Sequence, residues 1–196
     1  DIGCTTDNVL TMSYGLTTKK YDSPEKRNAF NEALLDRVRA IPGVRGAALG
    51  SDVPGAGYGG DDVFTISEHP PIKPGAVQPD GLTRVAGPQY FSVLQIPLLS
   101  GRFFTTDDRV GRPKTIIISQ QLARQYFPGE DPLGKHMHVA AQDKADYQIV
   151  GVVGDTLYQV GEPGRPTMYF PLLNGDSNVR ELTMVERAAS NPRSLS

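Results

Sequence analysis

Three histidines are the residues of this sequence best suited to metal or acid–base chemistry. His136 and His138 lie two positions apart in a run that alternates like a β-strand, so their side chains share one face, a spacing that two metal ligands can use. The apolar residues that alternate with them are the expected buried side. His69 lies beside Glu68 in a proline-rich loop, and no H-E-x-x-H pattern joins the three histidines. We therefore expect solvent-facing histidines, with a metal-dependent hydrolase built on His136, His138 and a carboxylate as the rival interpretation.

Three pairs of adjacent carboxylates are the other candidates for acid–base chemistry. Each pair lies among turn residues, and neighbours in a solvated loop seldom face one another as general acid–base catalysis requires. Turn formation and helix capping explain them better. No nucleophile elbow or phosphate-binding loop accompanies them, so we expect no enzyme, no catalytic residue, no cofactor and no metal. The pairs are Asp61/Asp62, Asp107/Asp108 and Glu130/Asp131.

A glycine-rich segment over residues 55–60 satisfies the G-x-G-x-x-G pattern of dinucleotide-binding loops. Such a loop must open a helix whose N-terminus holds the pyrophosphate. Here Asp61 and Asp62 add negative charge, and a strand pattern follows them. The sequence therefore predicts a flexible connector that is also the best candidate for a moving or partner-contacting element. The candidate contact residues are Gly55, Gly57, Tyr58 and Gly60.

The composition is that of a globular chain with many turns. Its 196 residues and 21.2 kDa suffice for one large domain or two small lobes. Basic residues number 20 and acidic residues 22, and the net charge of −2 argues against a nucleic-acid partner because phosphate binding needs a basic excess. Cys4 is the single cysteine, which excludes an internal disulfide and a cysteine-built metal site.

No segment predicts a membrane span. The longest apolar run, Ile149–Gly154, is far shorter than the roughly 18 residues that cross a bilayer. We therefore expect no transmembrane helix within these residues. Because the chain begins at Asp1 without the charged and apolar regions of a signal peptide, we expect an excised piece or a processed product.

The opening residues give the clearest element signals. Val9–Tyr14 alternates as a half-buried strand, and Val44–Leu49 is a second short strand. Between them Ser23 is a helix N-cap, Pro24 suits the first helical position, and a Pro-Gly pair ends the helix. These elements predict a βαβ unit with a right-handed crossover onto one sheet. The predicted buried face of the helix carries Phe30, Ala33, Leu34, Val38 and Ile41.

The rest of the chain predicts a strand-rich mixed region, and the fold class is therefore α+β. Short apolar or alternating runs are separated by turn residues. Two short helices interrupt them, one opening at Pro88 and one capped by Ser119. The strands are expected at Val63–Ser67, Leu82–Ala86, Thr115–Ser119, Lys135–Ala140, Tyr147–Val153, Met168–Leu172 and Leu182–Glu186.

Three segments, in this order and spacing, carry a family resemblance. The first joins GPQYF at 87–91 to IPLLSGRFF at 96–104, the second runs from IIIS to PLGK over 116–135, and the third joins IVGVVGD at 149–155 to MYFP at 168–171. The chain thereby resembles the extracytoplasmic domain of bacterial MacB-like ABC-transporter permeases, a family that includes lipoprotein-release and FtsX-related permeases. Its loops are most similar to those of the duplicated orphan permeases.

The resemblance implies a fold of two lobes. A βαβ porter-like lobe, of split ferredoxin-like type, is expected from residues 1–60 and 178–196, and a strand-rich mixed lobe from residues 61–177 is inserted into it. Ser190-Asn191-Pro192 has the pattern of a helix start, so we expect the C-terminal part of the porter-like lobe to be truncated.

The resemblance also implies a non-enzymatic function outside the cytoplasmic membrane. Such a domain transmits ATP-driven movements of a permease to substrates or partner proteins, in efflux or lipoprotein release. The implied partners are the transmembrane helices of the permease, its dimer partner and a periplasmic adaptor or carrier protein. The alternative is a stand-alone extracytoplasmic module that binds a lipid, a peptide or a drug-like ligand.

The residues that carry the resemblance have structural explanations. The aromatic residues can seed a core, the glycines and prolines can shape turns, and Arg102 can pair with a loop carboxylate. The motif residues taken as structural are Tyr90, Phe91, Gly101, Arg102, Phe104, Phe127, Pro128, Gly129, Asp131, Pro132, Gly134 and Gly151.

Overall fold

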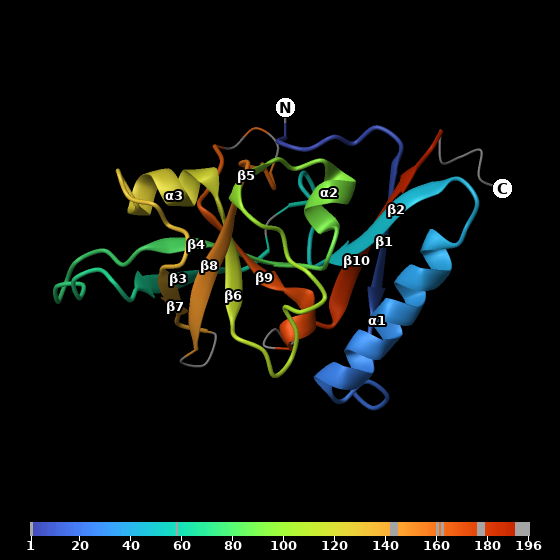
Figure 1. Cartoon of the computed structure of the whole chain (residues 1–196), viewed down its shortest axis with the longest axis horizontal. Helices are drawn as coiled ribbons and strands as arrows, with labels where there is room; N and C mark the ends of the chain where they lie inside the picture. The colour runs from blue at the N-terminus through green and yellow to red at the C-terminus, as the bar shows by residue number, and fades with distance from the viewer. Residues whose placement is uncertain are drawn as a thin grey trace.

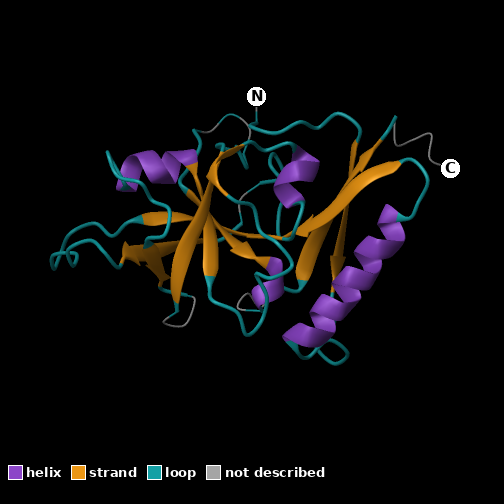
Figure 2. Ribbon diagram, in the orientation of Figure 1, coloured by secondary structure: helices purple, strands orange, loops and turns teal. Residues whose placement is uncertain are grey.

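The computed structural model describes residues 2–57, 59–141, 145–159, 161, 163–175 and 179–190. Within these ranges the chain forms a mixed α+β fold, as the sequence predicts. Figure 1 labels the elements, and Figure 2 shows strands running through the middle of the molecule with helices at its periphery. The elements are β1 (Val9–Gly15), α1 (Pro24–Arg39), β2 (Val44–Gly50), β3 (Asp61–Ile66), β4 (Asp80–Ala86), α2 (Tyr90–Leu94), β5 (Leu98–Gly101), β6 (Thr115–Ser119), α3 (Gln120–Tyr126), β7 (His136–Val139), β8 (Asp146–Val153), β9 (Thr167–Pro171), η1 (Leu172–Asn174) and β10 (Glu181–Ala188).

The first and last strands of the described chain form a three-stranded unit. β1 pairs with β10 and β10 with β2, both antiparallel, so β1 and β2 run parallel with β10 between them. The sequence predicted β1, α1 and β2 as consecutive elements on one sheet, and this is confirmed. The insertion of β10 between the two strands depends on a pairing about 170 residues away, which local patterns do not reveal.

The other strands close on themselves. Following the pairings from β4 through β3, β7, β8, β6 and β9 leads back to β4, with which β9 runs parallel. We call these six strands the ring. β5 lies outside it and pairs with β8. A single register pair, Gly50 of β2 with Ala86 of β4, joins the ring to the three-stranded unit. Figure 1 shows the three-stranded unit with α1 at one end of the molecule and the ring toward the other.

Helix α1 begins where the sequence predicts. The Ser23 side chain accepts a hydrogen bond from the Lys26 backbone N–H at 3.3 Å, and Pro24 takes the first helical position. The predicted buried face is wrong in part, because Ala33 is exposed and Ile41, beyond the helix end, is 47% exposed. The helix is rotated so that a partly polar stripe faces inward. The buried residues of α1 are Arg27, Asn31, Leu35 and Val38.

The start of α2 differs from the prediction. The helix begins at Tyr90, and its N-cap, Gln89, has a left-handed φ of 69° with no side-chain cap bond, so Pro88 lies outside the helix. The elements β5 and η1 have no counterpart in the sequence prediction. β5 is four residues long, and Leu98 and Leu99 within it are both largely exposed, so it carries no apolar alternation. By contrast Ser119 caps α3 as predicted, accepting from the Leu122 N–H.

Candidate functional site: the cleft beneath the proline-rich loop

The segment from Ser67 to Pro79, here called the proline-rich loop, links β3 to β4 and projects from the end of the molecule (Figure 1). Four of its residues are prolines, at positions 70, 71, 74 and 79, and it contains no helix or strand. Loops of this length without secondary structure are uncommon in compact domains and are usually functional or disordered. The base of this loop is held in place, because the Ser67 N–H donates to His136 O at 2.9 Å and the Phe64 N–H to Pro79 O at 2.9 Å.

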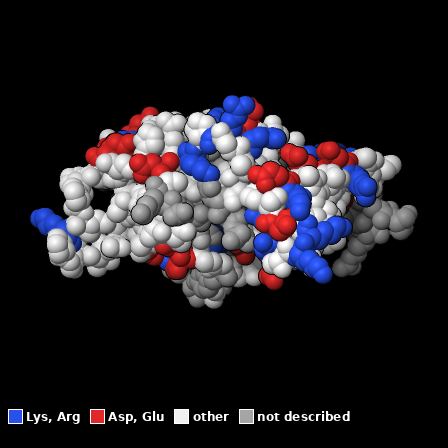
Figure 3. Space-filling model, turned by 90° about the horizontal axis from the view of Figure 1, so that it is seen from below, with Lys and Arg blue, Asp and Glu red and all other residues white. Residues whose placement is uncertain are grey.

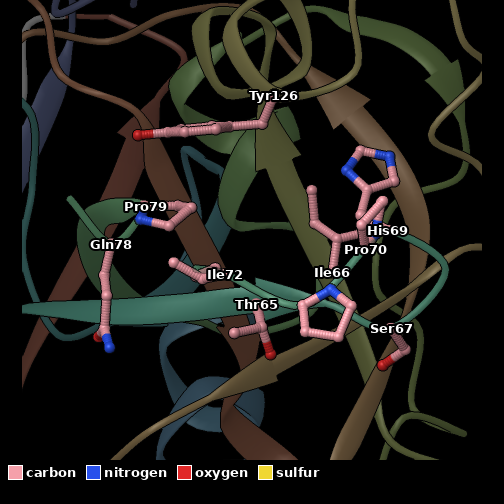
Figure 4. A pocket seen from close by; sticks show the side chains of 10 residues that line it. Thr65, Ile66, Ser67, His69, Pro70, Ile72, Gln78, Pro79 and Tyr126 are labelled. Carbon is pink, nitrogen blue, oxygen red and sulfur yellow. The ribbon is translucent and has the colours of Figure 1, made fainter. Parts of the chain in front are cut away.

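A cleft of about 520 Å³ lies between the two arms of the proline-rich loop and helix α3. Tyr126 of α3 forms one wall, and Figure 4 shows its ring facing Ile72 and Pro79 across the opening. The ring is held by an edge contact with Phe64, 5.0 Å between centroids, and its hydroxyl donates to Asp80 O at 3.4 Å. The cleft is lined by Thr65, Ile66, Ser67, His69, Pro70, Pro71, Ile72, Gln78, Pro79 and Tyr126.

Histidine–carboxylate pairs tie the proline-rich loop to the loop between α3 and β7. Nε2 of His69 lies 3.4 Å from Glu130, which also pairs with Lys135. Nδ1 of His136 lies 2.8 Å from Glu68, and the His136 backbone N–H donates to the same carboxylate at 3.0 Å. The sequence shows no motif that joins the three histidines, and each of the two carboxylates contacts a different histidine. Their partners lie 61 and 68 residues away, beyond the reach of any short motif.

The predicted arrangement of β7 is confirmed. His136 and His138 share the more exposed face, while Met137 and Val139 are buried. His138 lies opposite Asp146 in the β7–β8 ladder. Across the described ranges, no three His, Cys, Asp or Glu side chains gather as a metal would require. The His69–Glu130 and His136–Glu68 contacts join the proline-rich loop to the segment that leads into β7 and to β7 itself.

Replacing Glu68 with glutamine is expected to lower the free energy of unfolding by less than about 1 kcal/mol, because both side chains of its pair are more than a third exposed. Burial alone would raise the pKa of Glu68, but hydrogen bonds from the His136 backbone and ring outweigh it and lower the pKa. A lowered folded-state pKa means that this contribution is present at neutral pH and lost as pH falls through that pKa. Urea unfolding at pH 7 and pH 3 measures it. A loss as large at pH 3 as at pH 7 would contradict this assignment.

The aromatic residues of the family motifs lie in the core. Tyr90, Phe91, Phe104 and Phe127 are each less than 5% exposed, and Phe91 packs against both Tyr90 and Phe104. Burial of this apolar area is the main stabilising contribution such residues make. A partner cannot reach them without unfolding the domain.

The motif glycines and prolines shape loops. Gly101, Gly129 and Gly134 have φ values of 75° to 80°, a region that favours glycine. A Cβ on Gly151 would lie 2.3 Å from Arg102 O, so the backbones of these two residues approach too closely for any side chain. The motif prolines flank the loop that carries Glu130 and Asp131. Pro128 is exposed and Pro132 is buried.

Arg102 pairs with a loop carboxylate as expected. Its two terminal nitrogens donate to the two oxygens of Asp108 at 2.8 and 2.9 Å. Asp108 is 4% exposed and also accepts from the Thr105 N–H at 2.7 Å and from the Thr115 hydroxyl at 2.8 Å. This carboxylate therefore fixes the loop after β5 against the start of β6.

The other carboxylate pairs form turns and ion pairs. Asp131 accepts from the Leu133 N–H at 3.0 Å, and Asp62 accepts from the Val63 N–H at 2.8 Å. Asp61 pairs with Arg165 at 3.0 Å. These contacts agree with the turn-forming role that the sequence suggested.

The glycine-rich segment is tied down on one side. The Gly55 N–H donates to Leu157 O at 2.9 Å and the Gly57 N–H to Tyr158 O at 2.8 Å, while Gly60 O accepts from the buried Arg84 at 3.0 Å. The segment leads into β3 and not into a helix, which confirms that it is no dinucleotide-binding loop. Of the predicted contact residues, Tyr58 lies outside the described residues.

The family was identified by comparison with known proteins. The MacB-like periplasmic core domain family matches residues 5–192, nearly the whole chain. The chain belongs to this family. Its members are the periplasmic core domains of inner-membrane transporters, so the chain lies on the extracytoplasmic side as part of an ABC-transporter permease. Within the described residues, no helix has the length and apolar character needed to cross a membrane.

Curated relatives include macrolide export ATP-binding/permease proteins MacB. The chain is 29% identical over 105 residues to the protein from Aggregatibacter actinomycetemcomitans, covering 50% of the chain and 16% of that protein. It is 26% identical over 124 residues to the protein from Rhodopseudomonas palustris strain BisB18, covering 60% of the chain and 19% of that protein. The chain therefore spans less than a fifth of the length of these relatives.

Solved structures support the fold. The extracellular domain of the noncanonic ABC-type transporter YknZ from Gram-positive bacteria matches with a TM-score of 0.60 at 16% identity, covering 95% of this chain and 86% of that one. The periplasmic region of MacB from Actinobacillus actinomycetemcomitans also gives a TM-score of 0.60, at 15% identity, covering 98% and 82%. At such identities the likeness establishes the mixed α+β fold of the family and no more.

Proposed function

We propose that this domain transmits ATP-driven movements of its permease to substrates or partner proteins outside the membrane, without catalysing a reaction. The family match over residues 5–192 is the observation that carries the proposal. The implied partners are the transmembrane helices of the permease, the second permease of a dimer, and a periplasmic adaptor or carrier protein. Efflux and lipoprotein release are the two transport classes that such a role serves.

The sheet supports a division into two lobes. We infer a porter-like lobe from residues 1–60 and 178–196, of split ferredoxin-like type, and an inserted lobe from residues 61–177. In support, the strands of the two units meet over a short stretch, the register pair Gly50–Ala86 and the flanking backbone bonds from the Ser51 N–H to Val85 O and from the Gly87 N–H to Leu49 O. The Tyr90 ring leaves no room there for a side chain at Gly50. A narrow junction between two well-paired units is a natural place for rigid-body movement.

Two polar contacts beside this junction join α1 to the inserted lobe. A movement that separates the lobes on this side must break them. The Asn28 side chain of α1 donates to Leu173 O at 3.0 Å, and Glu32 of α1 pairs with Arg109 at 3.4 Å. Both groups of the ion pair are nearly half exposed, so their separation costs little free energy. The two lobes also share buried apolar packing, since Leu49 and Met184 lie in one cluster with Phe170, so a change of their angle must shift these contacts as well.

Spin labels on the full-length permease test the proposal. With Cys4 replaced by serine, Ala33→Cys puts one label on exposed α1 in each protomer, and Arg124→Cys adds one on exposed α3. Transmission predicts that vanadate-trapped ATP hydrolysis shifts the Ala33–Ala33 distance distribution in the dimer. The Ala33–Arg124 pair within one protomer reports any change of lobe angle.

The control is the same labelled permease with an ATPase variant that does not bind ATP, which should keep the nucleotide-free distribution under the same conditions. If both distance distributions are unchanged under vanadate trapping, transmission by this domain is wrong. A binding module that serves the permease without moving would then be the better description.

A further inference from the structure

The two arms of the proline-rich loop leave backbone groups without partners. The Ala76 N–H donates to Lys73 O at the tip, and no backbone bond joins one arm to the other above the base. In the described part of the chain, the N–H groups of Val77 and Gln78 donate to no backbone or side-chain acceptor. The arms thus stand apart around the cleft, and Figure 3 shows the opening between them at the projecting end.

The proline-rich loop also exposes apolar side chains to water, which is unfavourable for an isolated domain. Val77 is 94% exposed, the most exposed of the large apolar side chains in the described residues, and directly precedes Gln78 in the cleft wall. Ile72 lies inside the cleft opposite Tyr126 (Figure 4). An apolar rim beside an apolar cleft is typical of a surface that a partner covers.

The loop is arranged in advance for binding. Its prolines restrict the backbone, and its base is fixed by backbone bonds and by the His69–Glu130 contact at 3.4 Å. The Phe127 ring packs 5.5 Å from the His69 ring and supports it from the core. The prolines and the fixed base lower the conformational entropy that the loop must lose on binding, which favours affinity.

The residues that line the cleft determine which class of ligand fits it. None of the ten residues that line the cleft is Asp, Glu, Lys or Arg, so the lining offers no carboxylate, ammonium or guanidinium group to an ionic ligand. The N–H groups of Val77 and Gln78, the Thr65 and Ser67 hydroxyls and the Gln78 amide can exchange water for the donors and acceptors of a polypeptide backbone, which an acyl chain does not offer.

We propose that the cleft beneath the proline-rich loop binds an extended, uncharged segment of a partner polypeptide. The backbone of this segment meets the free N–H groups of the loop, and its apolar side chains cover Val77 and enter the cleft beside Ile72 and Tyr126. The proposal deepens the proposed function, since it assigns the surface by which the domain engages a protein outside the membrane.

The probe is a phage-displayed library of linear 12-residue peptides, panned on the 196-residue chain. Selected peptides are synthesised with a fluorophore, and their affinity is measured by fluorescence anisotropy. We expect uncharged, apolar sequences, and a loss of affinity of tenfold or more with Val77→Asp and with Ile72→Asp. Val110→Asp is the matched control, because Val110 is 41% exposed on a loop remote from the cleft, and it should leave the affinity unchanged.

Circular dichroism melts of each variant show whether it is folded, and Val77→Asp, which alters an exposed side chain, should melt as the parent chain does. Selection of no peptide, selection of charged peptides, or equal binding to Val77→Asp and Val110→Asp would overturn the proposal. So would Val77-dependent binding to phosphatidylethanolamine/phosphatidylglycerol vesicles, which would assign the loop to a lipid surface, or Val77-dependent self-association in sedimentation. The spin-label distances at Ala33 do not depend on Val77, so failure here leaves the proposed function standing.

Discussion

Replacing Asp108 with alanine should lower the free energy of unfolding by about 2–4 kcal/mol, since the substitution removes a buried carboxylate that accepts from several donors. The Arg102 guanidinium loses its bidentate partner, and the Thr105 N–H and the Thr115 hydroxyl lose their acceptor. We place the loss below the upper range for buried ion pairs because the Arg102 side chain is 47% exposed and water can solvate it. Urea unfolding at pH 7 measures the change.

A double-mutant cycle separates the ion pair from the other bonds of Asp108. Arg102→Ala alone leaves the buried carboxylate with the Thr105 and Thr115 donors, and the double variant should cost less than the sum of the two single changes. Additive losses would show that the two side chains do not interact, in contradiction to the 2.8 Å contact.

The stability of the protein at acid pH should also depend on the Asp108 carboxylate. Burial alone would raise the pKa of Asp108, but the hydrogen bonds from Arg102, Thr105 and Thr115 outweigh it and hold the pKa below its usual range. The contribution of this carboxylate is therefore complete at neutral pH and is lost as pH falls through its lowered folded-state pKa. The stability of Asp108→Ala should fall less steeply than that of the parent chain across the acid range.

The sequence predicts elements well where a signal is local. Ser119 precedes a helix and follows a run of isoleucines, and both β6 and the cap of α3 lie where this pattern places them. The same holds for Ser23 and Pro24 at α1. Each of these caps bonds to a backbone N–H three residues later, so the residues that determine the helix start all lie in one short segment.

The sequence fails where distant segments decide the outcome. Asn31 is buried in α1 because its side chain accepts from the Tyr14 hydroxyl of β1 at 2.8 Å, a contact that no helical periodicity contains. Arg84 is 2% exposed, and its guanidinium lies 4.2 Å over the Tyr158 ring beneath the glycine-rich segment. A charged residue in an alternating strand is ordinarily predicted to face solvent. Arg84 is buried because β4 belongs to the closed ring of strands.

The candidate site illustrates the same limit. The prolines between positions 70 and 79 indicate a loop, and the sequence describes it as such. The cleft forms because that loop faces Tyr126, which belongs to a helix about 50 residues later. A cleft between segments so far apart follows from the pairing of β3 with β7 and β4, which tertiary structure alone determines.

Gly101→Ala should be the most damaging single substitution of the motif residues. Gly101 ends β5 with a φ of 76°, and a Cβ there would lie 2.2 Å from Val150 O in the paired strand β8. The left-handed conformation costs about 1–2 kcal/mol for alanine, and forcing the strands apart adds about 1–3 kcal/mol or more. We expect a total loss of about 2–5 kcal/mol, seen as a large fall in the thermal midpoint or in the soluble yield.

Gly129→Ala provides the matched control for this prediction. Gly129 has nearly the same φ, 75°, but no atom lies within 4 Å of the position its Cβ would take. Its substitution therefore carries the conformational cost of about 1–2 kcal/mol without the steric one. The difference between the two variants isolates the approach of β5 to β8, because the backbone strain is common to both. Equal losses would mean that β8 yields freely at Val150 and that the β5–β8 pairing does not fix the position of the Arg102 loop.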